Sequence, residues 1–250
     1  MSKLLWQVFV VVIVLLGWFA GNHFNVFNRD VIPPMTDVAY QFIAAWARPE
    51  FLPAIWSTLS DALMGIFFAA VLAVPLGLLI GSLRAVEIAT RTLLDFGRAF
   101  PVVALLPIFV LLIGANSAMK IVTIAIACFF PILLQTIYGV RRQEPVIVDT
   151  VRSFRIPHHL RFFRVLLPSA LPYIATGIRI AATVSILVAV GTEVIMPVPG
   201  VGRQISVASI NDEVALAFAY VIYAGFLGVI LTTLWEIAEE RMLPWARRTR

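Results

Sequence analysis

Basic and aromatic side chains that could bind another molecule gather in one stretch, residues 149–168, which reads DTVRSFRIPHHLRFFRVLLP. Arginine supplies N–H donors for charge-assisted hydrogen bonds, and exposed aromatic rings add apolar contact area. Two long apolar segments flank this stretch. The composition therefore indicates a recognition surface held between two apolar elements, although a basic loop that only sets membrane topology would look similar.

Residues that could carry out catalysis are scattered along the chain. The only lysines, Lys3 and Lys120, do not follow a glycine, so the sequence lacks a phosphate-binding loop of the GxxxxGK[ST] type. Three histidines and one cysteine, Cys128, show no metal-ligand spacing such as HExxH. No GxSxG motif is present either. The sequence therefore predicts a non-enzymatic chain with no resident metal or cofactor.

The overall composition is that of an integral membrane protein. Of the 250 residues, 61% are hydrophobic and 13% are charged, against roughly 45–50% and 25% in soluble domains. A bilayer core of about 30 Å needs roughly 20 apolar residues per helix. Six segments approach that length, at residues 4–20, 55–80, 99–114, 121–140, 171–196 and 214–237. We expect an all-α polytopic protein with six transmembrane helices in one domain, residues 1–250. The bulky residues Trp18 and Phe19 disfavour cleavage of the first segment as a signal peptide.

Basic residues set the expected orientation of these spans. Placing both termini in the cytoplasm puts the loop with Arg84 and Arg91, the loop of residues 141–168 and the arginine-rich tail inside. Lys120 then falls among the few basic residues in outer loops. This asymmetry follows the positive-inside rule. It also explains the net charge of +5 through contact with lipid headgroups, so nucleic-acid binding is not required.

Two features inside the predicted spans suggest a pathway or gate. Pro101 and Pro107 interrupt the third span, and prolines free backbone carbonyls that need another partner; an ordinary proline kink is the alternative. Glu193 lies deep in the fifth span, where a charge needs a partner or a wet cavity. Arg179 is too far along the same helix to reach it. We favour gating or structural pairing for Glu193, with simple exposure at the interface as the alternative.

Local signals predict how the basic stretch folds. Pro145 suits the first position of a helix that would run to about Phe154. Pro157 forces Ile156 out of the helical conformation and allows a second helix to start. The result would be a helix, an elbow and a helix that carries Arg161 into the next span.

The spacing of this stretch resembles the signature of ABC importer permeases, which runs EAA, three residues, G, nine residues, I, one residue, LP. Counting back from Pro168 places Val165 at the Ile position, Arg155 at the Gly position and residues 149–151 at EAA. Arg155 thus replaces a glycine at the elbow, where a side chain has a steric cost. Ile156 and Pro157 are expected to supply the bend instead.

Further landmarks extend the resemblance over about residues 31–213. The segments PLGLLIGSLRAVE, RAFPVVALLPIFVLLIG, LPSALPYIATGIRIAA and PGVGRQI are similar to those of the permease subfamily for taurine, aliphatic sulfonates and nitrate. The resemblance implies a type I importer in a bacterial inner membrane, with a small anionic solute. Other members of the subfamily serve pyrimidine thiamine precursors, riboflavin or aromatic acids.

The resemblance also implies partners and contact residues. These partners are a second copy of the chain, two cytoplasmic ATPases that bind ATP and Mg, and an external solute-binding protein. The expected ATPase-coupling residues are Asp149, Thr150, Val151, Arg152, Arg155, Ile156, Pro157, His158, His159, Arg161 and Pro168. An ion-coupled secondary transporter would need buried titratable groups, for which only Glu193 and Asp61 are candidates. A membrane scaffold for an ATPase is the other alternative.

Overall fold

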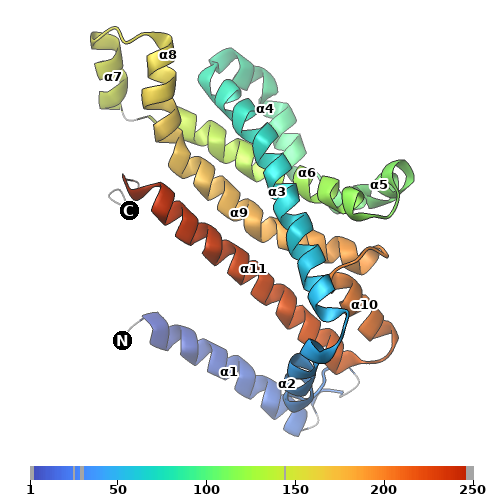
Figure 1. The fold of residues 1–250 in the computed structure, drawn as a ribbon. Helices are drawn as coiled ribbons and strands as arrows, with labels where there is room; N and C mark the ends of the chain where they lie inside the picture. The colour runs from blue at the N-terminus through green and yellow to red at the C-terminus, as the bar shows by residue number, and fades with distance from the viewer. Residues whose placement is uncertain (1–2, 25, 29–30, 144, 246–250) are drawn as a thin grey trace.

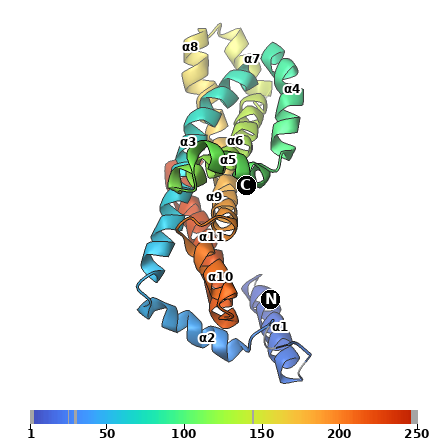
Figure 2. The ribbon, with the colours of Figure 1, turned by 90° about the vertical axis from the view of Figure 1, so that its right-hand side faces the viewer.

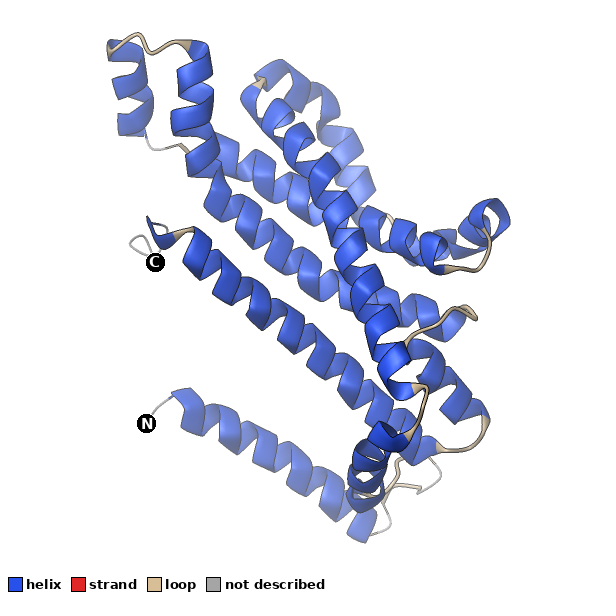
Figure 3. Ribbon diagram, viewed as in Figure 1, coloured by secondary structure: helices blue, strands red, loops and turns tan. Residues whose placement is uncertain are grey.

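The computed structural model describes residues 3–24, 26–28, 31–143 and 145–245. All regular secondary structure in these ranges is helical (Figure 3). The helices are α1 (Lys3–His23), α2 (Met35–Ala44), α3 (Phe51–Ser82), α4 (Arg84–Ala99), α5 (Leu106–Ile113), α6 (Ser117–Arg141), α7 (Pro145–Ser153), α8 (His158–Arg161), α9 (Leu167–Ile195), α10 (Val201–Ile210) and α11 (Val214–Met242). Short turns η1 (Ala45–Ala47), η2 (Val102–Leu105) and the π-helical η3 (Phe162–Leu166) complete the set.

Among the residues that the structure describes, four helical segments are long and apolar enough to cross a membrane. They are α3, α6, residues 159–195 with α9, and α11. A fifth crossing is formed if α4 and the η2–α5 segment, which are bent by 80° relative to each other, count as one broken span. The protein is therefore an all-α polytopic membrane protein with four to five apolar spans. Within α1, the segment Val8–His23 counts as a shorter apolar helix.

Glycines bring α3 and α6 into close contact at the centre of the molecule. A Cβ added at Gly77 would lie 2.6 Å from Thr136 Cβ, and one added at Gly81 would lie 2.7 Å from Val140 Cβ. Small residues at such contacts let helix backbones approach each other in a membrane. Helix α9 packs on the other side of α6, where Gly177 approaches the α6 backbone. Buried residues of α3, α6 and α9 make up much of the hydrophobic core (the α3–α6–α9 core), and these helices lie between the end with α7 and α8 and the end with α2 (Figure 2).

The predicted third span is wrong in its bounds. Residues 84–98, expected in a cytoplasmic loop, form most of α4, and the eight residues of α5 extend only about 12 Å. Pro101 ends α4 because the preceding residue, Phe100, is extended at φ −74° and ψ 126°. Pro107 lies in the first turn of α5, where its missing N–H costs nothing. Neither proline interrupts a continuous helix.

The two ends of the molecule carry different elements. Helices α7 and α8 project at one end, and α2 and α10 lie at the other (Figure 1). At the α2 end, the Phe42 ring stacks on Tyr223 of α11 with 4.2 Å between ring centroids, and the Tyr223 hydroxyl donates to the Phe42 carbonyl oxygen at 2.6 Å. These contacts fix α2 against the start of the last span.

Candidate functional site: a helical hairpin and a buried ion cluster

The basic stretch forms a helical hairpin, as predicted. Helix α7 ends at Ser153, a turn follows, and α8 begins at His158 (Figure 1). Two backbone bonds close the end of α7: the Phe154 N–H donates to Thr150 O at 3.0 Å and the Ile156 N–H to Val151 O at 3.2 Å. The second bond spans five residues, as in a Schellman motif. The chain is thus turned back sharply before it enters the next span.

Arg155 itself supplies the left-handed residue of this turn. Its φ is 47°, a conformation that glycine adopts freely and that costs other residues about 1–2 kcal/mol. The expectation that Ile156 and Pro157 provide the bend in its place is therefore wrong. Pro157 instead precedes α8 and accepts a bond from the Arg161 N–H at 2.9 Å. A Schellman turn needs positive φ at this position whatever residue occupies it.

Substitutions at Arg155 should reveal this backbone strain. We expect Arg155→Gly to unfold at the same or a slightly higher temperature than the parent. Arg155→Val should be less stable than the glycine variant by about 1–2 kcal/mol, because a β-branched residue fits positive φ poorly. Thermal unfolding of the detergent-solubilised permease measures both. Equal stability of the glycine and valine variants would contradict a left-handed residue at this turn.

The sequence-predicted contact residues occupy different environments on the hairpin. Asp149, Thr150, Arg155, Pro157 and His159 are exposed, Ile156 and Arg161 are half-buried, and Pro168 lies in the first turn of α9. Val151 is buried, so it anchors α7 and does not present its side chain outward. The side chains of Arg152 and His158 lie outside the described residues. Sequence reasoning missed Phe154, which is 77% exposed at the tip of the hairpin.

A buried ion cluster at the opposite end was not predicted as a unit. The Lys120 ammonium lies 2.8 Å from Asp61 Oδ2 and 2.8 Å from Glu193 Oε1. It also donates to the carbonyl oxygen of Pro199 at 2.8 Å and to Ser57 Oγ at 3.3 Å. Lys120 is fully buried. Its assignment to an outer loop is therefore wrong, and Lys120 is the partner that Glu193 needed.

Glu193 is held by further donors. The Thr58 hydroxyl lies 2.9 Å from both carboxylate oxygens, and the Gly202 N–H in the first turn of α10 donates to Oε2 at 2.9 Å. The Thr58 oxygen also accepts the Val201 N–H at 2.9 Å. Helix N-termini favour negative charge because their first N–H groups are unpaired. The buried Glu193 carboxylate is thus paired with an ammonium group, a hydroxyl and a backbone N–H.

The cluster also explains two glycines of the PGVG segment. Gly200 has a φ of 152°, and a Cβ at this position would overlap the Glu193 carboxylate. At Gly202 a Cβ would lie 2.7 Å from Glu193 Cβ. The cluster thus ties α3, α6, α9 and α10 together through one lysine. Pro101 and Pro107 are exposed and stand outside it.

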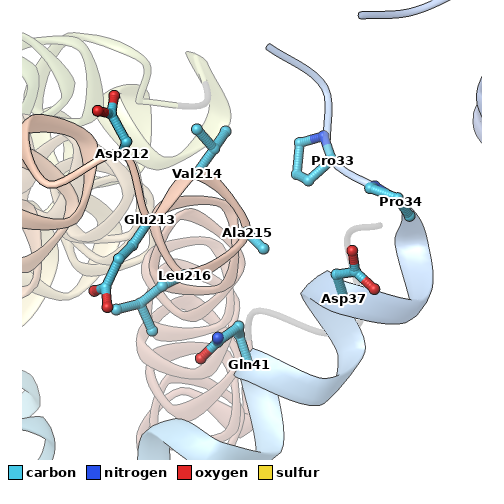
Figure 4. Close-up of a pocket in the computed structure, with 9 residues that line it drawn as sticks. All are labelled: Pro33, Pro34, Asp37, Gln41, Asp212, Glu213, Val214, Ala215 and Leu216. Atoms are coloured by element: carbon cyan, nitrogen blue, oxygen red, sulfur yellow. The ribbon is translucent and has the colours of Figure 1, made fainter. Parts of the chain in front are cut away.

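An open pocket of about 300 Å³ lies between α2 and the turn that joins α10 to α11 (Figure 4). Its polar lining includes Asp37, Gln41, Asp212 and Glu213. The three carboxylates disfavour an anionic ligand. Among the described residues, no group of three or more His, Cys, Asp or Glu side chains is arranged to hold a metal ion. The pocket therefore adds no candidate site.

Comparison with solved structures supports the fold. A chain of the inward-facing MetNI methionine ABC transporter superposes with a TM-score of 0.61, covering 77% of this chain and 94% of that chain at 18% identity. A chain of an amino acid ABC transporter solved with histidines gives a TM-score of 0.60 at 16% identity, with coverage of 77% and 94%. At this identity the likeness shows the ABC importer permease fold alone.

Comparison with known sequences gives information beyond the fold. The putative aliphatic sulfonates transport permease SsuC of Bacillus subtilis (strain 168) is 25% identical over 93% of this chain and 84% of its own length. The bicarbonate transport system permease CmpB of Synechococcus elongatus is 30% identical over 77% of this chain and 68% of its own. The model of the family described as binding-protein-dependent transport system inner membrane component matches residues 73–244, which include the hairpin and the ion cluster except its α3 side chains. The chain therefore belongs to this family: it is a multi-pass inner-membrane permease subunit of an ABC transporter and not itself the ATPase.

Proposed function

We propose that this permease subunit of a binding-protein-dependent importer carries a small organic or inorganic anion of the sulfonate, taurine or nitrate kind. The observation that supports this solute class most directly is the naming of two relatives. One is named for aliphatic sulfonates and the other for bicarbonate, and both solutes are small anions. Phosphate-binding loops are absent from the sequence, so the energy comes from a partner chain.

The proposed assembly contains two copies of this chain, two ATPases that bind ATP and Mg, and an external solute-binding protein. In this assembly each chain would contribute half of the transport pathway. We propose that α1 makes a sixth span, that both termini lie in the cytoplasm and that residues 1–250 form one transmembrane domain. The basic residues near the α7–α8 end support this orientation through the positive-inside rule.

In this proposal the α7–α8 hairpin is the coupling element. Exposed Arg155, His159 and Phe154 offer charge and an aromatic ring to a cleft on the ATPase. Closure of the ATPases on ATP would move the hairpin as a rigid body, and the α3–α6–α9 core would carry that motion to the other end of the spans. The Lys120 cluster would then hold the outer ends of three spans together while they move.

Transport by the reconstituted complex tests the solute class. The permease, its ATPase and its binding protein would be placed in liposomes with ATP on the ATPase side. We expect accumulation of labelled taurine or bicarbonate that requires both ATP and the binding protein. Uptake that persists without ATP and collapses with the proton gradient would overturn the mechanism. ATP-driven uptake of only solutes that lack a sulfonate or other anionic group would overturn the solute class.

A further inference from the structure

Helix α4 carries a charged face that the coupling proposal does not use. Its charged side chains recur at positions i, i+7, i+11 and i+14, which lie on one side of a helix. They are Arg84, Arg91, Asp95 and Arg98, and Glu87 at i+3 lies on the same side. Three arginines, one aspartate and one glutamate give this face a formal charge of +1, and Arg141 of α6, which pairs with Glu87, raises the local charge to +2. Leu93 and Phe96, which are 68% and 65% exposed, make a separate apolar face on the same helix.

Two contacts fix the depth of this charged face. Glu87 forms an ion pair with Arg141 at the last residue of α6, and a Cβ at Gly97 would overlap the ring of Phe130. Ten residues separate the two contacts on α4 and eleven separate them on α6. Helix α4 therefore runs antiparallel to α6, and the two contacts have nearly the same spacing on both helices. Gly97 and its neighbour Arg98 therefore lie at about the same position along the α6 axis as Phe130.

Phe130 lies near the middle of a spanning helix. Thirteen residues separate it from Ser117 and eleven from Arg141, or about 20 Å and 16 Å at 1.5 Å per residue. Arg98 and Asp95 form an ion pair of 3.0 Å, yet their side chains remain 59% and 55% exposed in the single chain. A charged side chain at the bilayer centre costs about 2.5–3.5 kcal/mol on insertion scales. The charged face therefore needs water or a polar partner, and lipid can cover the face of Leu93 and Phe96.

We propose that the charged face of α4 lines the water-filled transport pathway and that Arg98 contacts the anionic solute there. A guanidinium has five N–H donors, so Arg98 can pair with Asp95 and with a sulfonate or carbonate oxygen at the same time. The excess of positive charge attracts an anion in a low-dielectric site. The nature of the solute rests on the proposed function, whereas the hydration of this face rests on the geometry of α4 and α6 alone.

Cysteine labelling tests the hydration without any transport. Arg98→Cys and Phe96→Cys would be made in a Cys128→Ala background, in the full complex in liposomes. A charged, membrane-impermeant thiosulfonate reacts with hydrated thiolates, so we expect it to label position 98 at least tenfold faster than position 96. Equal rates, or no labelling at position 98 because a second copy covers it, would overturn the proposal.

Uptake of labelled taurine and bicarbonate tests the contact with the anion. We expect Arg98→Gln to lower uptake at least tenfold and Arg98→Lys to recover part of it, while the matched Arg241→Gln at the end of α11 transports like the parent. Arg98→Gln with full uptake would overturn the inference and leave the proposed function intact. If the parent transports neither solute, the solute class fails, and the contact of Arg98 with the anionic group fails with it. The labelling result then still decides whether the face is hydrated.

Discussion

Replacing Lys120 by methionine should destabilise the permease by about 3–5 kcal/mol and leave little intact protein in the membrane. Methionine fills much of the space of the lysine stem but cannot donate to Asp61 or Glu193, whose carboxylates are both buried. Removing one partner of a buried ion pair leaves an uncompensated charge, which costs far more than the pair contributes. Membrane yield and thermal unfolding in detergent measure the loss.

A matched control and a compensating variant sharpen this prediction. Arg203→Met removes an exposed cation from neighbouring α10 and should leave stability within about 0.5 kcal/mol of the parent. Adding Glu193→Gln and Asp61→Asn to Lys120→Met should recover part of the loss, because no unpaired charge remains. A Lys120→Met protein as stable as the parent, or a triple variant no better than the single one, would contradict the pairing.

Charge reversal on the hairpin should uncouple the permease from its ATPase. We expect replacement of Arg152, Arg155 and Arg161 by glutamate to reduce ATPase co-purification at least tenfold and to bring ATP-driven uptake to background. Glutamates in place of arginines would repel the acidic groups with which the arginines are expected to pair on the ATPase. The buried packing of the permease itself is untouched. The permease should still insert and show the same thermal unfolding, because Val151 and the α9 core keep their contacts.

The control for this variant is Arg241→Glu, which reverses an exposed charge at the end of α11, away from the hairpin sequence. It should bind the ATPase like the parent. Measurements at two salt concentrations separate charge from shape, since screening weakens exposed pairs. A triple variant that retains both ATPase binding and uptake would remove the hairpin from the coupling path.

Local signals predicted those parts of the molecule that depend on neighbours in sequence. The apolar runs predicted α3, α6, α9 and α11 within a few residues of their bounds, because a membrane span must satisfy its own backbone groups. Pro145 and Pro157 correctly marked the two helices of the hairpin. The prediction failed at residues 84–113, where a charged helix replaced an expected loop. A hydropathy search passes over such a helix because its charged residues lower the mean hydropathy of the segment below that of an apolar span.

The sequence by itself determined that this chain is a helical membrane protein with a basic hairpin and no ATP-binding loop. Its spacing even identified the elbow position, where backbone geometry demands positive φ whether or not glycine is present. Only the tertiary structure decided which buried charged side chains pair with each other. Lys120 meets Asp61 and Glu193 from 59 and 73 residues away, and no periodicity encodes such pairings. They arise because close-packed helices bring side chains that are distant in sequence to the same depth in the membrane. A buried charge is stable there only beside a charge of opposite sign.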